Sequence, residues 1–137
     1  MKKLPIIAAL AALAAAPAFA EGDAAKGEKL FKKCKSCHMI VNGDEVIFKG
    51  GKTGPNLYGV IGRQVAGVEG FKYGKGLKEL GEQGMVWDEE SLAAWITNPK
   101  DFLKAHEVTP KTKMTFKLKK GAEDMAAYLA SLSPKAE

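Results

Sequence analysis

The stretch 29-KLFKKCKSCHMI-40 decides how this chain of 137 residues folds. It contains the only two cysteines of the sequence, Cys34 and Cys37, and His38 directly follows the second. Two thiols and an imidazole, all able to bind metals or to form covalent links, therefore lie within five consecutive positions. The rest of the sequence has to be interpreted around this cluster.

Four kinds of site use cysteines in such a pattern. A zinc ion needs four ligands, but His106 is the only other histidine and there is no further cysteine. A thioredoxin-like redox pair belongs to a βαβ unit, which this sequence does not predict, and a disulfide across two residues would stabilise little. Cys-x-x-Cys-His is instead the attachment motif of a c-type haem, because two thiols three apart on a helix reach two vinyl groups and the histidine reaches the iron.

The first 20 residues have the pattern of a secretory signal. Lys2 and Lys3 precede an apolar run at 4–16, and Ala18-Phe19-Ala20 is a small-residue cleavage pattern. The run is shorter than the ~20 residues that span a bilayer. We predict cleavage after Ala20, one domain over 21–137 and a periplasmic location. Loss of the two lysines lowers the formal net charge from +5 to +3.

Three segments have the apolar period of an amphipathic helix. Asp23 and Asp88 are suitable N-caps for the first two, and Asn98-Pro99 stops the second. The predicted segments are 23–34, 88–98 and 122–132, with a short helical turn at 99–104.

The segment 41–76, between the first two helices, is rich in glycine and predicts loops and turns, apart from a short ribbon at 46–48. So long a loop in a small domain indicates that it wraps something other than protein. We therefore predict an all-α fold, with three main helices, short helical turns and long loops around one covalently bound haem.

The second axial position of the iron can be open, for gas binding or peroxide chemistry, or closed by methionine for electron transfer. Met39 follows the motif histidine and cannot reach the opposite face, while Met85 and Met125 are expected to pack in the core. Met114 lies in a lysine-rich loop with no evident packing role and is the predicted ligand. His106 is the alternative.

The order of these motifs resembles that of the small class I cytochromes c, and most closely the bacterial periplasmic cytochrome c2 type, which is similar to mitochondrial cytochrome c. The resemblance extends over almost all of 21–134. The segments that carry it are 26-KGEKLFKKCKSCH-38, 52-KTGPNLYGVIGR-63, 71-FKY-73, 86-VWDEE-90, 97-TNPKDFL-103, 113-KMTF-116 and 123-EDMAAYL-129.

The resemblance implies further residues around the haem. The carbonyl of Pro55 is expected to accept a hydrogen bond from Nδ1 of His38, which fixes the tautomer of the axial imidazole. Arg63, Tyr73 and Trp87 match residues that hydrogen-bond the haem propionates, which need donors when they are buried.

Four more positions follow from the same resemblance. Phe116 matches an aromatic residue beside the exposed haem edge, and Gly27 and Tyr128 match the crossing of the first and last helices. Trp95 stands where the family usually has a tyrosine whose hydroxyl bonds the methionine sulfur. An indole donates only through its N–H and from another place on a larger ring, so this bond stays open.

The function predicted in this way is one-electron transfer and not enzyme catalysis. The resemblance implies a membrane cytochrome bc complex as donor, and a photosynthetic reaction centre, a terminal oxidase or both as acceptor. A monomer is expected to reach membranes only through these partners and to bind no nucleic acid. Lysines would steer transient docking onto acidic partner surfaces. The candidates are Lys33, Lys35, Lys52, Lys111, Lys113 and Lys117.

Two alternatives remain open at this stage. One is a haem protein with an open sixth position, which would bind gases or act like a peroxidase. The other is a dedicated electron donor to one periplasmic reductase.

Overall fold

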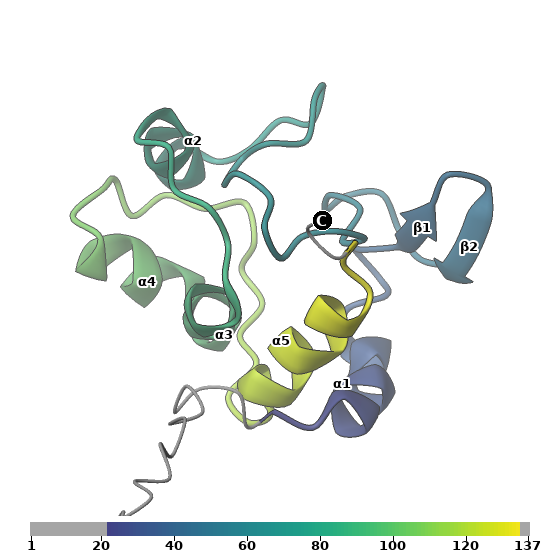
Figure 1. Ribbon diagram of the computed structural model, residues 1–137. Helices are drawn as coiled ribbons and strands as arrows, with labels where there is room; N and C mark the ends of the chain where they lie inside the picture. Colours follow the sequence, from purple (N-terminus) through teal and green to yellow (C-terminus); the bar gives the residue numbers. More distant parts are fainter. Residues whose placement is uncertain (1–21, 135–137) are drawn as a thin grey trace, which may run out of the picture.

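The computed structural model of the protein describes residues 22–134, so the predicted signal and its cleavage site lie outside the described residues. Within this range, helices and loops enclose a cavity. A small two-stranded hairpin projects from them (Figure 1). The elements in chain order are α1 (Ala24–Leu30), the 3-10 turn η1 (Phe31–Lys33), β1 (Ile40–Asn42), β2 (Glu45–Phe48), α2 (Lys75–Glu82), α3 (Glu89–Thr97), α4 (Pro99–Ala105) and α5 (Ala122–Ser131).

The first and last helices cross at the base of the fold, where α1 and α5 lie side by side (Figure 1). Gly27 makes this approach possible. A Cβ atom at this position would lie 2.1 Å from the carbonyl oxygen of Asp124 and 2.7 Å from Cβ of Tyr128. The predicted crossing of Gly27 and Tyr128 is confirmed. Asp23 caps α1 as predicted, because its carboxylate accepts hydrogen bonds from the amides of Ala25 and Lys26.

Helices α3 and α4, in the middle of the chain, also begin and end where the sequence predicts. Asp88 and Ser91 form a capping box at the start of α3. Asn98 then ends α3 and caps α4, and Pro99 occupies the first turn of α4. The last predicted segment is α5, with Met125 and Leu129 on its buried face.

The region predicted as loops is more ordered than expected. Strands β1 and β2 pair antiparallel and include the predicted ribbon. The prediction of loops through residue 76 is wrong at its end, because α2 begins at Lys75. Two glycines in α2, which lower its helix propensity, allow neighbouring backbone to approach closely. A Cβ at Gly76 would lie 2.4 Å from the carbonyl oxygen of Thr109, and one at Gly81 would lie 2.4 Å from that of Val65.

Beneath the cavity, an aromatic cluster joins α3 and α4 to the segment before them. The ring centroids of Trp87, Trp95 and Phe102 lie 5.6 to 6.0 Å apart, and all three side chains are buried. In residues 22–134, no helix combines the length and the apolar character that crossing a bilayer requires.

Candidate haem site

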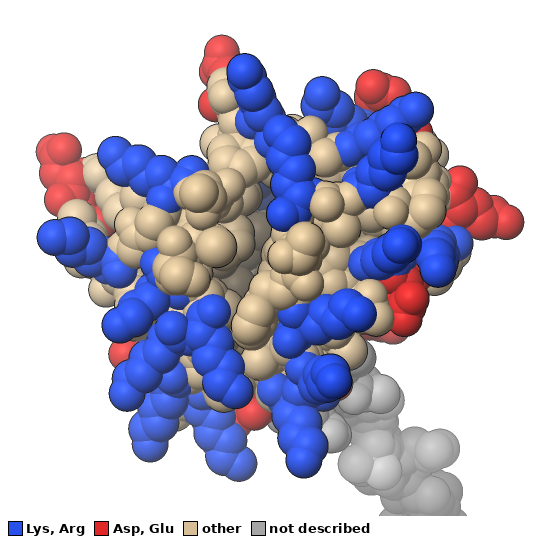
Figure 2. All heavy atoms as spheres, turned by 180° about the vertical axis from the view of Figure 1, so that it is seen from behind, with Lys and Arg blue, Asp and Glu red and all other residues tan. Residues whose placement is uncertain are grey.

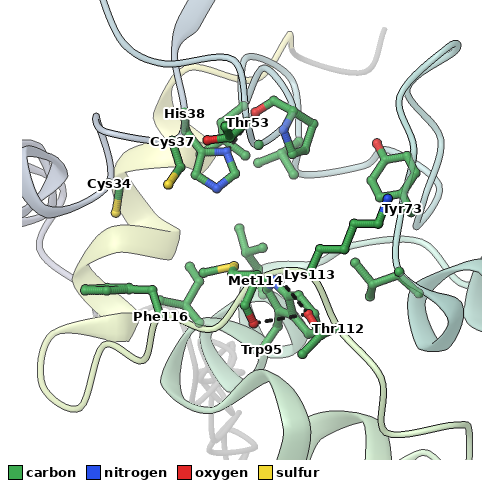
Figure 3. A pocket seen from close by; sticks show the side chains of 18 of the residues that line it. Cys34, Cys37, His38, Thr53, Tyr73, Trp95, Thr112, Lys113, Met114 and Phe116 are labelled. Atoms are coloured by element: carbon green, nitrogen blue, oxygen red, sulfur yellow. Dashed lines mark hydrogen bonds between the residues drawn. The ribbon is translucent and has the colours of Figure 1, made fainter.

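One cavity brings together every side chain that the sequence proposed for the haem site. These residues are Cys34, Cys37, His38, Pro55, Arg63, Tyr73, Trp87, Trp95, Met114 and Phe116. They come from opposite ends of the chain, and Figure 3 shows the two cysteines and His38 on one side of the space and Met114, Trp95 and Phe116 on the other. The fold therefore converts scattered motifs into two facing walls.

The first wall is the turn that follows η1. The amides of Cys37 and His38 both donate to the carbonyl of Cys34, at 3.1 and 2.9 Å, so the helical path continues through the motif. Burial, with a smaller contribution from the neighbouring Cys37, raises the pKa of the Cys34 thiol to about 11. Before a haem is attached, this sulfur is therefore a neutral thiol at neutral pH.

The imidazole of His38 is held from behind. Its Nδ1 lies 2.8 Å from the carbonyl oxygen of Pro55, so the ring donates there and its other nitrogen is directed into the cavity (Figure 3). Burial lowers the pKa of His38, and the bond to Pro55 opposes that shift in part. The imidazole is therefore neutral at neutral pH, which is the form that binds metal ions.

The segment that carries Pro55 is fixed by two neighbours. Gly54 must lack a side chain, because a Cβ there would lie 2.3 Å from Cε1 of the His38 ring. The side chain of Asn56 bonds both backbone groups of Val41 in β1, accepting at 3.0 Å and donating at 2.8 Å. Our sequence analysis missed Asn56. Its place directly after the proline that supports the histidine was the available signal.

A cluster of polar groups lies beside this wall. The guanidinium of Arg63 donates to the carbonyls of Asn56 and Tyr58. Burial lowers the pKa of Arg63, and the interaction with Tyr73 opposes part of this shift. The Tyr73 hydroxyl accepts a hydrogen bond from the amide of Val68 at 3.0 Å, which leaves its proton free to donate. The amide of Trp87 donates to the carbonyl of Arg63 at 2.9 Å. This corner of the cavity thus offers a cation and hydrogen-bond donors to a buried anion.

The second wall is a loop. The sulfur of Met114 is directed into the space opposite His38 (Figure 3). The Thr112 hydroxyl donates to the carbonyl of Met114 at 3.2 Å and accepts from its amide at 3.0 Å. Trp95 packs against Trp87 and lines the cavity near this loop. Phe116 is 40 % exposed at the rim, as expected for an aromatic residue beside an open edge.

The other candidate ligands are in poorer positions to bind an iron in the cavity. Met85 and His106 do not line the cavity. Met85 packs against the core, and the His106 ring packs against Phe102 at a tilt of 47°, with ring centroids 4.3 Å apart. Met125 does line the cavity, but it is 1 % exposed and packed within α5. Met39 lies next to His38 in the chain and is also outside the lining.

The rim of the cavity is basic. Its lining includes Lys33 and Lys113, which the sequence analysis named, and Lys72, which it did not. Figure 2 shows a hollow on one face of the molecule with Lys and Arg side chains around it, while Asp and Glu lie mostly toward the edge. Lys72 directly precedes Tyr73 in the sequence. Its place next to a predicted haem-site residue was the signal that could have identified it.

Known proteins are similar to this chain in both fold and sequence. The chain is 57 % identical to cytochrome c-550 of Paracoccus versutus, over 98 % of this chain and 92 % of the relative. It is 54 % identical to cytochrome c2 of Rhodobacter capsulatus, over 86 % and 88 %. The X-ray structure of cytochrome c2 from Paracoccus denitrificans superposes with a TM-score of 0.80 at 54 % identity, covering 85 % of this chain and all of the other. A search of protein-family models gave no match.

A helical fold around a cavity with a Cys-x-x-Cys-His wall defines a class I cytochrome c. The chain belongs to the cytochrome c-550 and c2 family of electron-transfer proteins, which are not enzymes. The predicted fold class is confirmed by these neighbours. The predicted cofactor, one haem c with its iron, covalently bound through Cys34 and Cys37, is confirmed as well. The residues present fit this group, because both thiols and the free nitrogen of His38 open into one apolar cavity.

Proposed function

We propose that this protein is a periplasmic one-electron carrier in which His38 and Met114 are the axial ligands of the haem. The observation that carries the proposal is the position of these two side chains on facing walls of one cavity (Figure 3). When bound, the haem supplies an iron that takes up and gives off a single electron. A site closed by two protein ligands suits this role better than it suits gas binding or peroxide chemistry.

The chain's own residues would keep the site unchanged during electron transfer. Pro55 holds the His38 ring in one orientation and one tautomer. Leu77, Trp95 and Ile96 contribute to a lining that excludes water. We propose that Trp95 packs beside the methionine and that the Met114 sulfur does without the hydrogen bond that the family tyrosine would provide.

The propionates of the haem need partners, and the corner around Arg63 offers them. We propose that Arg63, Tyr73 and Trp87 bind these carboxylates, because the guanidinium is already fixed by two backbone carbonyls and the tyrosine hydroxyl keeps a free proton. A positioned cation lowers the cost of burying a carboxylate.

Electrons would enter and leave at the rim beside Phe116. The lysines there, including Lys33, Lys72 and Lys113, favour acidic partner surfaces, and we propose transient complexes of a monomer with a cytochrome bc complex as donor and a reaction centre or terminal oxidase as acceptor. Reduction by the bc complex should slow about tenfold or more between low and physiological ionic strength. A rate that does not depend on salt would contradict steering by charge.

The periplasmic location rests on the signal-like residues 1–20. Cleavage after Ala20 would give a secreted chain that begins at Glu21. The mass of the mature holoprotein, with its haem attached, tests this directly. An uncleaved N-terminus would contradict the proposal on location without affecting the haem site.

The ligation is tested by the absorption spectrum of the purified ferric protein. We expect the weak long-wavelength band of a haem–methionine bond, and we expect the ferrous protein to bind carbon monoxide only slowly. The substitution Met114→Ala should abolish the band and admit carbon monoxide, whereas Met85→Ala, which does not alter the cavity lining, should leave both unchanged. A wild-type protein that lacks the band and binds carbon monoxide readily would favour an open sixth position instead.

A further inference from the structure

Glu79 in α2 holds the start of the loop that carries Met114. Its carboxylate accepts two hydrogen bonds from one residue, Thr109, from the backbone amide at 2.8 Å and from the hydroxyl at 2.6 Å. The two residues are 30 positions apart in sequence. We infer that Glu79 is a positioning residue that keeps Met114 at the iron by fixing residues 109–116, the methionine loop. This inference rests on the proposed ligation by Met114.

Three observations show that the first half of the methionine loop lies against the start of α2. The amide of Gly76 donates to the carbonyl of Lys111 at 3.1 Å. A side chain on Gly76 would collide with the carbonyl oxygen of Thr109 at 2.4 Å, and a Cβ on Gly74 would lie 3.1 Å from the amide nitrogen of Lys113. The backbone of the loop therefore lies directly against the start of this helix.

From this support the contacts continue to the methionine. Thr112 lies in the part of the loop that contacts the start of α2, because a Cβ on Gly74 would lie 3.1 Å from its Cα. Its hydroxyl oxygen accepts a hydrogen bond from the amide of Met114 at 3.0 Å. Beyond Met114, the next backbone hydrogen bond in the described residues runs from the amide of Leu118 to the carbonyl of Ile96 at 2.9 Å. In the described structure the segment between these attachments forms neither helix nor strand.

Among these supports, the bonds of Glu79 are the charge-assisted ones, and both reach one residue. Hydrogen bonds to a carboxylate are about twice as strong as neutral ones. The two bonds from Thr109 lower the pKa of Glu79, so the carboxylate is ionised at neutral pH. Pro110 follows Thr109 and has no amide of its own to offer. Loss of the carboxylate would therefore free the loop at its first fixed point.

A loosened methionine loop should make the iron more accessible to an added ligand. Imidazole binds ferric haem only where the sulfur has left, so its apparent affinity reports the fraction of molecules in which the loop is open. Glu79→Ala should raise the affinity for imidazole about fivefold, which is a modest value because Glu79 is only half-buried. Glu79→Gln keeps the size and one acceptor, and it should give a smaller increase.

The matched control is Glu82→Ala, which removes the same charge from an exposed position of the same helix. It should leave imidazole binding unchanged. Thr109→Val removes the hydroxyl partner, and together with Glu79→Ala it should add little to the effect of Glu79→Ala alone. Denaturant unfolding of each holoprotein, followed by circular dichroism, separates a local opening from a loss of overall stability.

Equal imidazole affinity in the wild type and Glu79→Ala would overturn the inference, as would an equal increase in Glu82→Ala. A fall in overall stability with unchanged imidazole binding would also overturn it, because Glu79 would then act on the fold and not on the loop. The proposed ligation fails in a different way. In that case the wild type would bind imidazole as readily as Met114→Ala and would lack the long-wavelength band.

Discussion

The wall of the cavity that carries His38 is held by a hydrogen-bonded turn and by the crossing of α1 and α5, whereas the wall that carries Met114 is a loop held mainly at one end. His38 bonds Pro55, 17 residues away, and its amide is part of the turn that begins at Cys34. Met114 depends on a loop whose support comes from α2, through Glu79 and Gly76. The same metal would thus have one firmly fixed ligand and one that is easier to displace.

This difference indicates which part of the site should be the more flexible. Local opening draws on regions with few buried contacts and few backbone hydrogen bonds. The methionine loop fits that description, because Met114 is half-buried and its neighbours Lys113 and Thr115 are exposed. Changes to the histidine wall should therefore act on the whole fold, and changes around the methionine loop should act mainly on ligand exchange.

The largest effect is expected at the helix crossing that supports the histidine wall. Gly27→Ala would place a Cβ 2.1 Å from the carbonyl oxygen of Asp124, so α1 and α5 would have to separate. We expect the free energy of unfolding of the holoprotein to fall by about 3 kcal/mol, measured by guanidinium denaturation. Gly43→Ala is the control, because a Cβ there meets nothing within 4 Å.

Gly43 has φ of +59°, so its substitution carries only the cost of a left-handed backbone, about 1 kcal/mol. If Gly27→Ala were no more destabilising than Gly43→Ala, the close crossing of α1 and α5 would not be what fixes this wall.

A smaller effect is expected at Asn56, which joins β1 to the segment behind the histidine. Asn56→Ala leaves the amide and the carbonyl of Val41 without their partners, which should cost about 2 kcal/mol in the free energy of unfolding. Asn56→Asp keeps the acceptor for the Val41 amide but sets a carboxylate oxygen against the Val41 carbonyl, to which Asn56 donates at 2.8 Å, so it should not restore the stability of the wild type. Full stability in Asn56→Asp would show that the bond to the Val41 carbonyl contributes nothing.

The smallest effect concerns the cap of α3, the helix that brings Trp95 to the methionine side. Asp88→Ala should lower the free energy of unfolding by about 1 kcal/mol at pH 7. The hydrogen bonds from the backbone and side chain of Ser91 lower the pKa of Asp88. A lowered pKa means that this contribution is present above the ordinary carboxyl pKa and is lost as the pH falls through the folded-state value.

The difference between wild type and Asp88→Ala should therefore shrink in acid when unfolding is measured as a function of pH. Asp88→Asn retains a capping side chain and should lose only the part that depends on pH. A difference between wild type and Asp88→Ala that stays constant down to the lowest pH tested would argue against a role for the ionised carboxylate.

The two walls also differ in how far the sequence predicts them. The histidine wall follows from a motif of five residues and from the local signal of the Asp23 cap, and the family resemblance adds Gly27 at the helix crossing. The support of the methionine loop does not, because Glu79 and Thr109 meet only through the fold and each is an ordinary residue in its own segment. Helix α2 was missed for a related reason. Its glycines lower helix propensity. They are needed for close contact with backbone that is distant in the sequence, which the sequence of the helix alone does not reveal.

The identity of the methionine at the iron is the central claim, and nuclear magnetic resonance of the ferrous protein tests it most directly. With methyl-labelled methionine, a methyl group bound over the haem plane is shifted far upfield by the ring current. We predict one such resonance in the wild type, absent from Met114→Leu and present in Met85→Leu and Met125→Leu. If the shifted methyl resonance persisted in Met114→Leu, or if the wild type showed none, His38 and Met114 would not be the pair that closes the site.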